Sequence, residues 1–123
     1  MSGSHRIVGP GPLLLVHNGE PIAPLLVANS VSSRSKGLLG SSGIEGALWL
    51  EPCASVHMMG MRYPIDAASL AGDGIVLHVA TLRPWLSWTP PRCGARITLE
   101  APAGFFAGHG IRVGDHLAIG GIN

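Results

Sequence analysis

The chain has 123 residues, of which 46% are hydrophobic and only 12% are charged, and its formal net charge is +1. This length fits one domain that buries its own core, and the absence of a Lys/Arg cluster argues against a nucleic-acid surface. No apolar run approaches the roughly 18 residues of a membrane span, and no charged region precedes a long apolar run at the N-terminus, so we expect a cytoplasmic protein.

Residues 1–12 are predicted to form a flexible arm rich in Gly and Pro, ahead of a single β domain at residues 13–120. The domain opens with a predicted hairpin, because Asn18-Gly19 is a strong turn signal between the runs Leu13–His17 and Glu20–Val27. Proline cannot donate a hydrogen bond to a neighbouring strand. Two prolines therefore predict that the second strand is an edge or is interrupted: Pro21 and Pro24.

The next segment predicts a helix. It begins at Asn29 or Ser30, whose side chains can cap it, and it ends at Gly40. Its inward face is formed by Val31, Ser35, Leu38 and Leu39. A Ser-Gly linker then leads to a short apolar strand at Ala47–Leu50.

A second hairpin occupies the middle of the chain. Ile65–Leu70 and Ile75–Val79 are apolar runs, and Gly72-Asp73-Gly74 between them supplies turn chemistry. The Pro-rich loop that follows displays two large rings, Trp85 and Trp88. Such rings are typical of recognition surfaces, and they can equally fold back as a lid over a thin core, so both interpretations stay open.

The last third predicts a strand at Ala95–Ala101, a turn or helical turn at Ala103–Gly108 and a closing strand at His116–Ile119. Short strands separated by turn signals are typical of all-β folds. We therefore expect a mostly β protein, a small sandwich or partly open barrel of short antiparallel strands with one short helix.

Charged residues inside apolar stretches are the first candidates for a site, since such residues rarely enter a core unless they are paired or used. They are Arg34, Arg62, Asp66, Glu100 and Asp115. The set could hold an anionic ligand, or it could form ion pairs that fix the strand register. We favour ion pairs for the set as a whole, and the segment from Arg62 to Asp66 as the best candidate for a site.

Soft-ligand residues are the second candidates. Cys53 and His57 are four residues apart and Met59 follows, a combination of ligands that suits copper or zinc. No second closely spaced pair completes a structural zinc site. The competing interpretation is that the methionines fill core gaps and that Cys53 and Cys93 are reduced thiols.

The run Met61-Arg62-Tyr63-Pro64-Ile65-Asp66, followed by the hairpin, resembles the signature of the family called domain of unknown function 192. Arg34–Gly40 is similar to the family's Arg-x-x-Gly-Leu-Met-Gly helix. Leu99–Gly104 and Gly110–Asp115 are similar to its Leu-Glu-x-Pro-Ala-Gly and Gly-Ile-x-x-Gly-Asp motifs. The resemblance covers most of the chain and implies a compact, mostly β domain with no established reaction.

These observations favour a small non-catalytic binding or accessory module that needs no cofactor. Its predicted surface is built around Met61, Arg62 and Asp66 and is flanked by Trp85 and Trp88. The expected partner is another protein or a small anionic ligand, contacted by Arg62, with no role for nucleic acid. One alternative is a small hydrolase-like enzyme that uses an Arg/Asp/Glu pocket. A second alternative is a copper or zinc site formed by the Cys/His/Met set.

Overall fold

The computed structural model describes residues 6–8, 13–28, 43–52, 63–84 and 92–121. The predicted helix from Asn29 to Gly40 and the Trp85/Trp88 loop lie outside these ranges. Nine strands and one short helix are assigned within them. In chain order they are β1 (Arg6–Val8), β2 (Leu13–His17), β3 (Glu20–Ala28), β4 (Gly43–Glu45), β5 (Ala47–Leu50), β6 (Ile65–Ala71), β7 (Val76–Leu82), β8 (Ala95–Pro102), α2 (Phe105–His109) and β9 (Leu117–Gly121).

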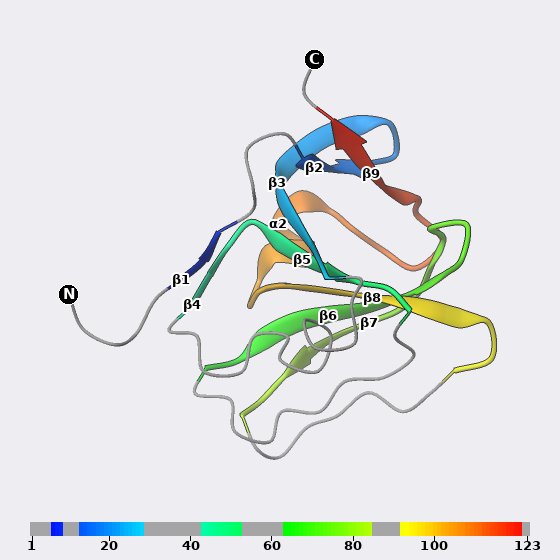
Figure 1. Ribbon diagram of the computed structural model, residues 1–123. Coiled ribbons are helices and arrows are strands. Elements are labelled where there is room, and N and C mark those ends of the chain that lie inside the picture. Colours follow the sequence, from blue (N-terminus) through cyan, green and yellow to red (C-terminus); the bar gives the residue numbers. More distant parts are fainter. Residues whose placement is uncertain (1–5, 9–12, 29–42, 53–62, 85–91, 122–123) are drawn as a thin grey trace.

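Seven of the strands form one sheet in the order β7-β6-β8-β5-β3-β2-β9, while β1 pairs with β4. Figure 1 shows the large sheet curling around α2. Its two edges approach each other at one corner, where Leu117 N–H donates to the carbonyl of Gly74 at 2.9 Å and Ile75 pairs with His116. The sheet does not close along its length, and the prediction of a mostly β fold with one short helix is confirmed.

The first predicted hairpin is formed by β2 and β3. Asn18 and Gly19 both have positive φ, 48° and 90°, as a two-residue hairpin turn of this kind requires. Strand β3 pairs with β2 through Glu20–Pro24, and Leu25–Ala28 pairs with β5. Each half of β3 therefore has a neighbour on one side, and both prolines lie in the half that faces only β2.

The strands are antiparallel with two exceptions, which correct the expectation of purely antiparallel pairing: β3 runs parallel to β5, and β1 runs parallel to β4. The connection from Ala28 to Ala47 is long enough to return the chain to Leu25, where the half of β3 that pairs with β5 begins, as a parallel pair needs. Gly46 has φ +79°, and a Cβ atom placed on it would lie 2.3 Å from the carbonyl oxygen of Pro24. Glycine at this position therefore allows β5 to enter beside β3.

Apolar side chains cover both faces of the central strands. One cluster includes Leu25, Trp49, Leu99 and the helix residue Phe106, and the other includes Leu48 and Ile65. Leu48 and Trp49 pair with Glu100 and Leu99 respectively, so the two clusters lie on opposite faces of the same strands. No helix among the described residues is long and apolar enough to cross a membrane.

Candidate functional site

A pocket with a volume of about 340 Å³ lies between the β6–β7 hairpin and the segment containing α2. Its walls are mostly apolar and are formed by Val79, Ala80, Gly104, Phe106, Ala107 and Ile111. Asp66 and Thr81 add polar atoms, and Asp66 is the only charged residue among the described lining residues. The volume lies near the lower end of the range of about 300–1,000 Å³ found for small-molecule sites.

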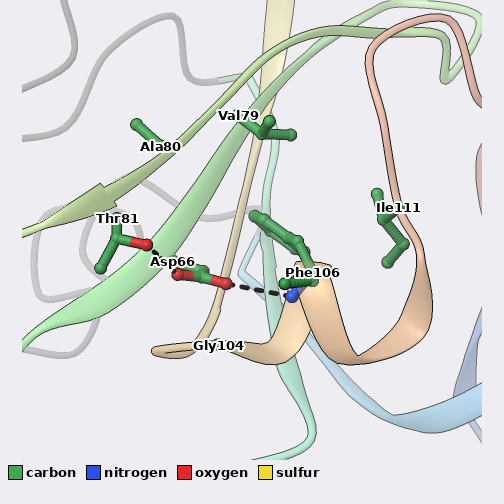
Figure 2. Close-up of a pocket in the computed structure, with 8 residues that line it drawn as sticks. Asp66, Val79, Ala80, Thr81, Gly104, Phe106 and Ile111 are labelled. Carbon is green, nitrogen blue, oxygen red and sulfur yellow. Dashed lines mark hydrogen bonds between the residues drawn. The ribbon is translucent and has the colours of Figure 1, made fainter.

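Asp66 links the three elements around this pocket (Figure 2). Its side chain comes from β6 and is 3% exposed. The hydroxyl of Thr81 on β7 donates to Oδ1 at 2.6 Å, and the backbone N–H of Phe106 in α2 donates to Oδ2 at 3.0 Å. Helix α2 begins after Gly104, which provides no side-chain cap. Asp66 therefore accepts from a helix-start N–H across a long stretch of sequence, as a capping residue would do locally.

The carboxylate of Asp66 can accept further hydrogen bonds in addition to the two described above. A carboxylate has about four lone-pair positions on its two oxygens, and the two described hydrogen bonds use one on each oxygen. A ligand that enters along the apolar walls can thus present a donor group to this carboxylate. Thr81, Phe106 and Ile111 were not among the residues that the sequence analysis selected.

The three predicted carboxylates do not come together. In the pairing of β6 with β8, Asp66 lies opposite Ala101 and Ala67 lies opposite Glu100. Neighbouring residues of a strand point to opposite faces, so Asp66 and Glu100 lie on different sides of the sheet. Asp115 lies in the segment before β9. Their predicted cationic partners, Arg34 and Arg62, lie outside the described residues, as do Met61, Trp85 and Trp88.

Glu100 is buried without full hydrogen bonding. Its side chain is 6% exposed, and Oε1 has no hydrogen-bond partner among the described residues. Burial raises the pKa of this carboxyl from 4.5 to about 7. The hydroxyl of Ser69 and Nδ1 of His78 also lack partners within the described ranges. Burial, together with the charge of Arg92, lowers the pKa of His78.

These polar atoms belong to one face of the sheet. Ser69 pairs with both His78 and Thr98, and Glu100 lies two residues beyond Thr98 on the same strand. The alternation of side chains therefore directs all four residues to the side opposite the Asp66 pocket. The sequence analysis selected Glu100 but not Ser69, whose place beside it follows from the pairing of β6 with β8.

Asp115 fastens the segment that precedes β9. Its Oδ2 lies 2.7 Å from Nε2 of His17 at the end of β2 and accepts from the N–H of Arg112 at 3.0 Å. The hydrogen bond with His17, followed by that from Arg112, lowers the pKa of Asp115. Nearby, the N–H of His116 donates to Oδ1 of Asn18 at 2.8 Å. This cluster connects the first hairpin to the last strand, which indicates a structural role for Asp115.

The predicted metal ligands Cys53, His57 and Met59 lie outside the described residues. Within the described ranges, no group of three His, Cys, Asp or Glu residues is arranged to hold a metal ion. Cys93 is exposed and free of a disulfide.

Comparison with solved structures shows the same fold in two bacterial proteins. A protein of unknown function from Novosphingobium aromaticivorans superimposes with a TM-score of 0.72 at 20% identity, covering 87% of this chain and 83% of that one. A protein from Sinorhizobium meliloti described as a putative transcription regulator superimposes with a TM-score of 0.70 at 18% identity, covering 89% and 91%.

Sequence comparison gives the family. An uncharacterised UPF0127 protein from Pyrococcus furiosus is 36% identical over 64 residues, 52% of this chain, and the match spans about half (54%) of that relative's length. Residues 15–119 match the model of the family described as Uncharacterized ACR, or domain of unknown function 192. The expected resemblance is thereby confirmed over most of the chain, and the protein belongs to the domain of unknown function 192 family.

Proposed function

We propose that this protein is a small, non-catalytic binding module and that the pocket at Asp66 is its ligand site. The observation that carries the proposal is a buried carboxylate set in an otherwise apolar pocket of about 340 Å³. Concave apolar sites with a few convergent polar groups are typical of ligand binding. Asp66 is also the last residue of the segment Met61–Asp66, which the sequence indicates as the best candidate for a site.

The chemistry of the walls favours a ligand with an apolar body and a cationic or donor end. Val79, Phe106 and Ile111 offer apolar surface, and the carboxylate of Asp66 attracts a positive group and repels an anion. An alkyl ammonium group fits this description. An anionic partner, as expected from the sequence, would have to be bound by Arg62 rather than in this pocket.

A non-catalytic role is supported by the lining itself. Covalent catalysis needs a nucleophile, a base that activates it and a group that orients the base. The described lining residues include no Cys, His or Lys, and the single hydroxyl, that of Thr81, donates to Asp66. The carboxylate in turn holds the N–H of Phe106. Both polar side chains thus take part in hydrogen bonds that fix the shape of the pocket, and Asp66 keeps further lone pairs for a donor group of the ligand.

The direct test is titration of the protein with N-acetyl-lysine methylamide, followed by amide chemical shifts in NMR. We expect saturable shifts at Asp66, Thr81 and Ala107. Ala107→Trp should fill the mouth of the pocket, since Ala107 is exposed and lines it, and should weaken binding at least about tenfold. Val113→Trp is the matched control, because Val113 is 61% exposed and lies outside the pocket. Absence of saturable shifts, or equal binding by both variants, would contradict the proposal.

The wider surface predicted from the sequence extends the proposal to Arg62. We expect Arg62→Ala to abolish binding of a protein partner or anionic ligand while the circular dichroism spectrum and unfolding midpoint stay unchanged. An unfolded variant would show that Arg62 is structural, and the surface would then be limited to the Asp66 pocket.

We also propose a cytoplasmic location. The support is chemical: Cys93 is exposed and is not in a disulfide, as is usual for thiols in a reducing compartment. Fractionation of bacteria that express the chain with its natural N-terminus tests this location, and recovery from the periplasmic fraction would contradict it.

A further inference from the structure

Strand β7 is one edge of the seven-stranded sheet. Its sequence, Val-Leu-His-Val-Ala-Thr-Leu, contains no proline, lysine or carboxylate. Edge strands normally carry such residues because their open N–H and C=O groups can pair with another chain. An edge without this protection, beside a pocket, has the features of a surface that recognises peptides by strand addition.

The chain itself already uses the start of this edge. The N–H of Val76 donates to the carbonyl of Asp115, and the carbonyl of Val76 accepts from the N–H of Gly114, both at 2.9 Å. Val76 lies opposite Leu70 of β6, and its main-chain hydrogen bonds point away from β6, so the two residues form a non-hydrogen-bonded pair. Beyond Val76, no described residue pairs with this edge.

The alternation of an antiparallel pair then locates the other outward groups. The irregularity between Ser69 and Leu70 adds its extra residue on β7, so the alternation along β6 is kept, and Ala68 and Asp66 share the pairing type of Leu70. Their partners on β7 are Val79 and Thr81. The N–H and C=O groups of these two residues accordingly point away from β6, toward the side of β7 on which no described strand lies.

The same two residues line the Asp66 pocket with their side chains. Figure 2 shows Thr81 beside Asp66 and Val79 farther along β7, with Phe106 and Ile111 on the side of the segment that contains α2. In paired strands, residues directly opposite each other place their side chains on the same face. A strand added along β7 would therefore present a side chain beside Val79 or Thr81, at the pocket that holds the carboxylate.

We propose, relying on the ligand-binding role of the Asp66 pocket, that the partner is an extended peptide segment that adds to the edge of β7, which no described residue pairs with beyond Val76, and inserts a lysine side chain into the pocket. Charge complementarity selects lysine, whose apolar stem can lie along Val79, Phe106 and Ile111 while its ammonium group reaches Asp66. Main-chain hydrogen bonds to Val79 and Thr81 supply affinity, and the pocket supplies specificity.

The test uses fluorescein-labelled Thr-Val-Thr-Lys-Thr-Val-Thr and the full chain, with binding followed by fluorescence anisotropy. Two derivatives are N-methylated on alternate residues, one on lysine and the residues two away, the other on the positions between. Strand addition predicts that one derivative loses at least about tenfold in affinity, because several hydrogen bonds disappear, while the other stays within about twofold. Replacing lysine by norleucine should also cost at least about tenfold.

The controls separate this inference from the proposed function. If N-acetyl-lysine methylamide binds and Ala107→Trp weakens it, but both methylated peptides bind equally well, strand addition is wrong and the pocket function stands. If neither the amide nor the peptide binds, both are wrong. Sedimentation of the protein alone tests the rival occupant: a dimer that dissociates on Val79→Pro would assign the β7 edge to a second copy of this chain and overturn the inference.

Discussion

Asp66 and Glu100 lie on paired strands one position out of register, and their carboxyl groups face opposite sides of the sheet. They also differ in how they are satisfied. Both oxygens of Asp66 accept hydrogen bonds, whereas Oε1 of Glu100 has no partner among the described residues. Two carboxylates close in space thus have different consequences for stability, and each can be tested by itself.

Replacement of Asp66 by Ala should destabilise the protein. The buried N–H of Phe106 and the hydroxyl of Thr81 would lose their acceptor, and a buried donor without a partner costs about 1–3 kcal/mol. We expect a lower urea midpoint with an unchanged m-value. Asp73→Ala is the control: its carboxylate accepts from the N–H of Ile75 in an exposed turn, so its loss should cost less than about 1 kcal/mol. Equal decreases in the free energy of unfolding for the two variants would contradict a stabilising role for the hydrogen bonds of Asp66.

The raised pKa of Glu100 predicts that the protein becomes less stable as the pH rises from about 4.5 to about 7. This pKa is raised from 4.5 to about 7 in the folded protein by burial, so the folded state holds the proton over this range and the unfolded state releases it. The free energy of unfolding should therefore fall by about 3 kcal/mol as pH rises through this window and stay level above it. Denaturant unfolding across this pH range measures the fall.

Substitution identifies the group responsible. Glu100→Gln should remove the fall and make the variant more stable than the wild type at pH 8. The same change at exposed Glu20 should leave the pH profile intact. A wild-type profile that stays flat between pH 4.5 and 7 would contradict the assignment.

The effect of Asp115 on the pH dependence of stability is opposite to that of Glu100. The folded pKa of Asp115 lies below the ordinary value of 3.8 because of the hydrogen bonds from His17 and Arg112. The stabilisation is therefore present above about pH 4 and is lost as the pH falls through the lowered pKa. Asp115→Asn should flatten the acid limb of the stability profile. In a double-mutant cycle, His17→Ala should have little further effect once Asp115 is replaced, and full additivity would rule out their coupling.

Substitutions at Gly46 and Gly94 can be compared directly, because both glycines have positive φ and differ in what surrounds them. Both have positive φ, 79° and 84°, but a Cβ atom on Gly46 would lie 2.3 Å from Pro24 O, while one on Gly94 would meet nothing within 4 Å. Gly94→Ala should cost about 1 kcal/mol from its φ alone. Gly46→Ala should cost about 3 kcal/mol, since β3 and β5 must separate. Thermal unfolding of the two variants gives the comparison, and equal costs would argue against the close approach.

The sequence was sufficient for the local elements, because both hairpins carry their own turn chemistry. Asn18-Gly19 and the Gly72–Gly74 turn each connect strands of the predicted type. The partner of Asp66 was not predictable in the same way. Counting back from the turn would place Ala80 opposite Asp66, but an irregularity between Ser69 and Leu70 shifts the register so that Thr81 takes this place.

The division of the charged set was also hidden in the sequence. The sequence indicated that Asp66 and Glu100 belong to the same charged cluster. They lie on opposite faces because of the register of β6 with β8, two strands that are far apart in the chain. The contribution of Phe106 depends on where α2 docks after the turn at Gly104. Long-range pairing of this kind is set by the packing of the whole core rather than by local propensity.

At one corner of the sheet, main-chain hydrogen bonds from Leu117 to Gly74 and from Gly114 to Val76 hold the two edges of the sheet together. These hydrogen bonds join the start of β9 to the β6–β7 hairpin, two segments that lie far apart in the chain, and such non-local contacts are slow to form during folding. The amides of Val76, Gly114 and Leu117 should accordingly exchange with deuterium together, as one cooperative unit. Opening of this corner would release the N–H and C=O groups of Val76, so the part of the β7 edge that no described residue pairs with would become one residue longer.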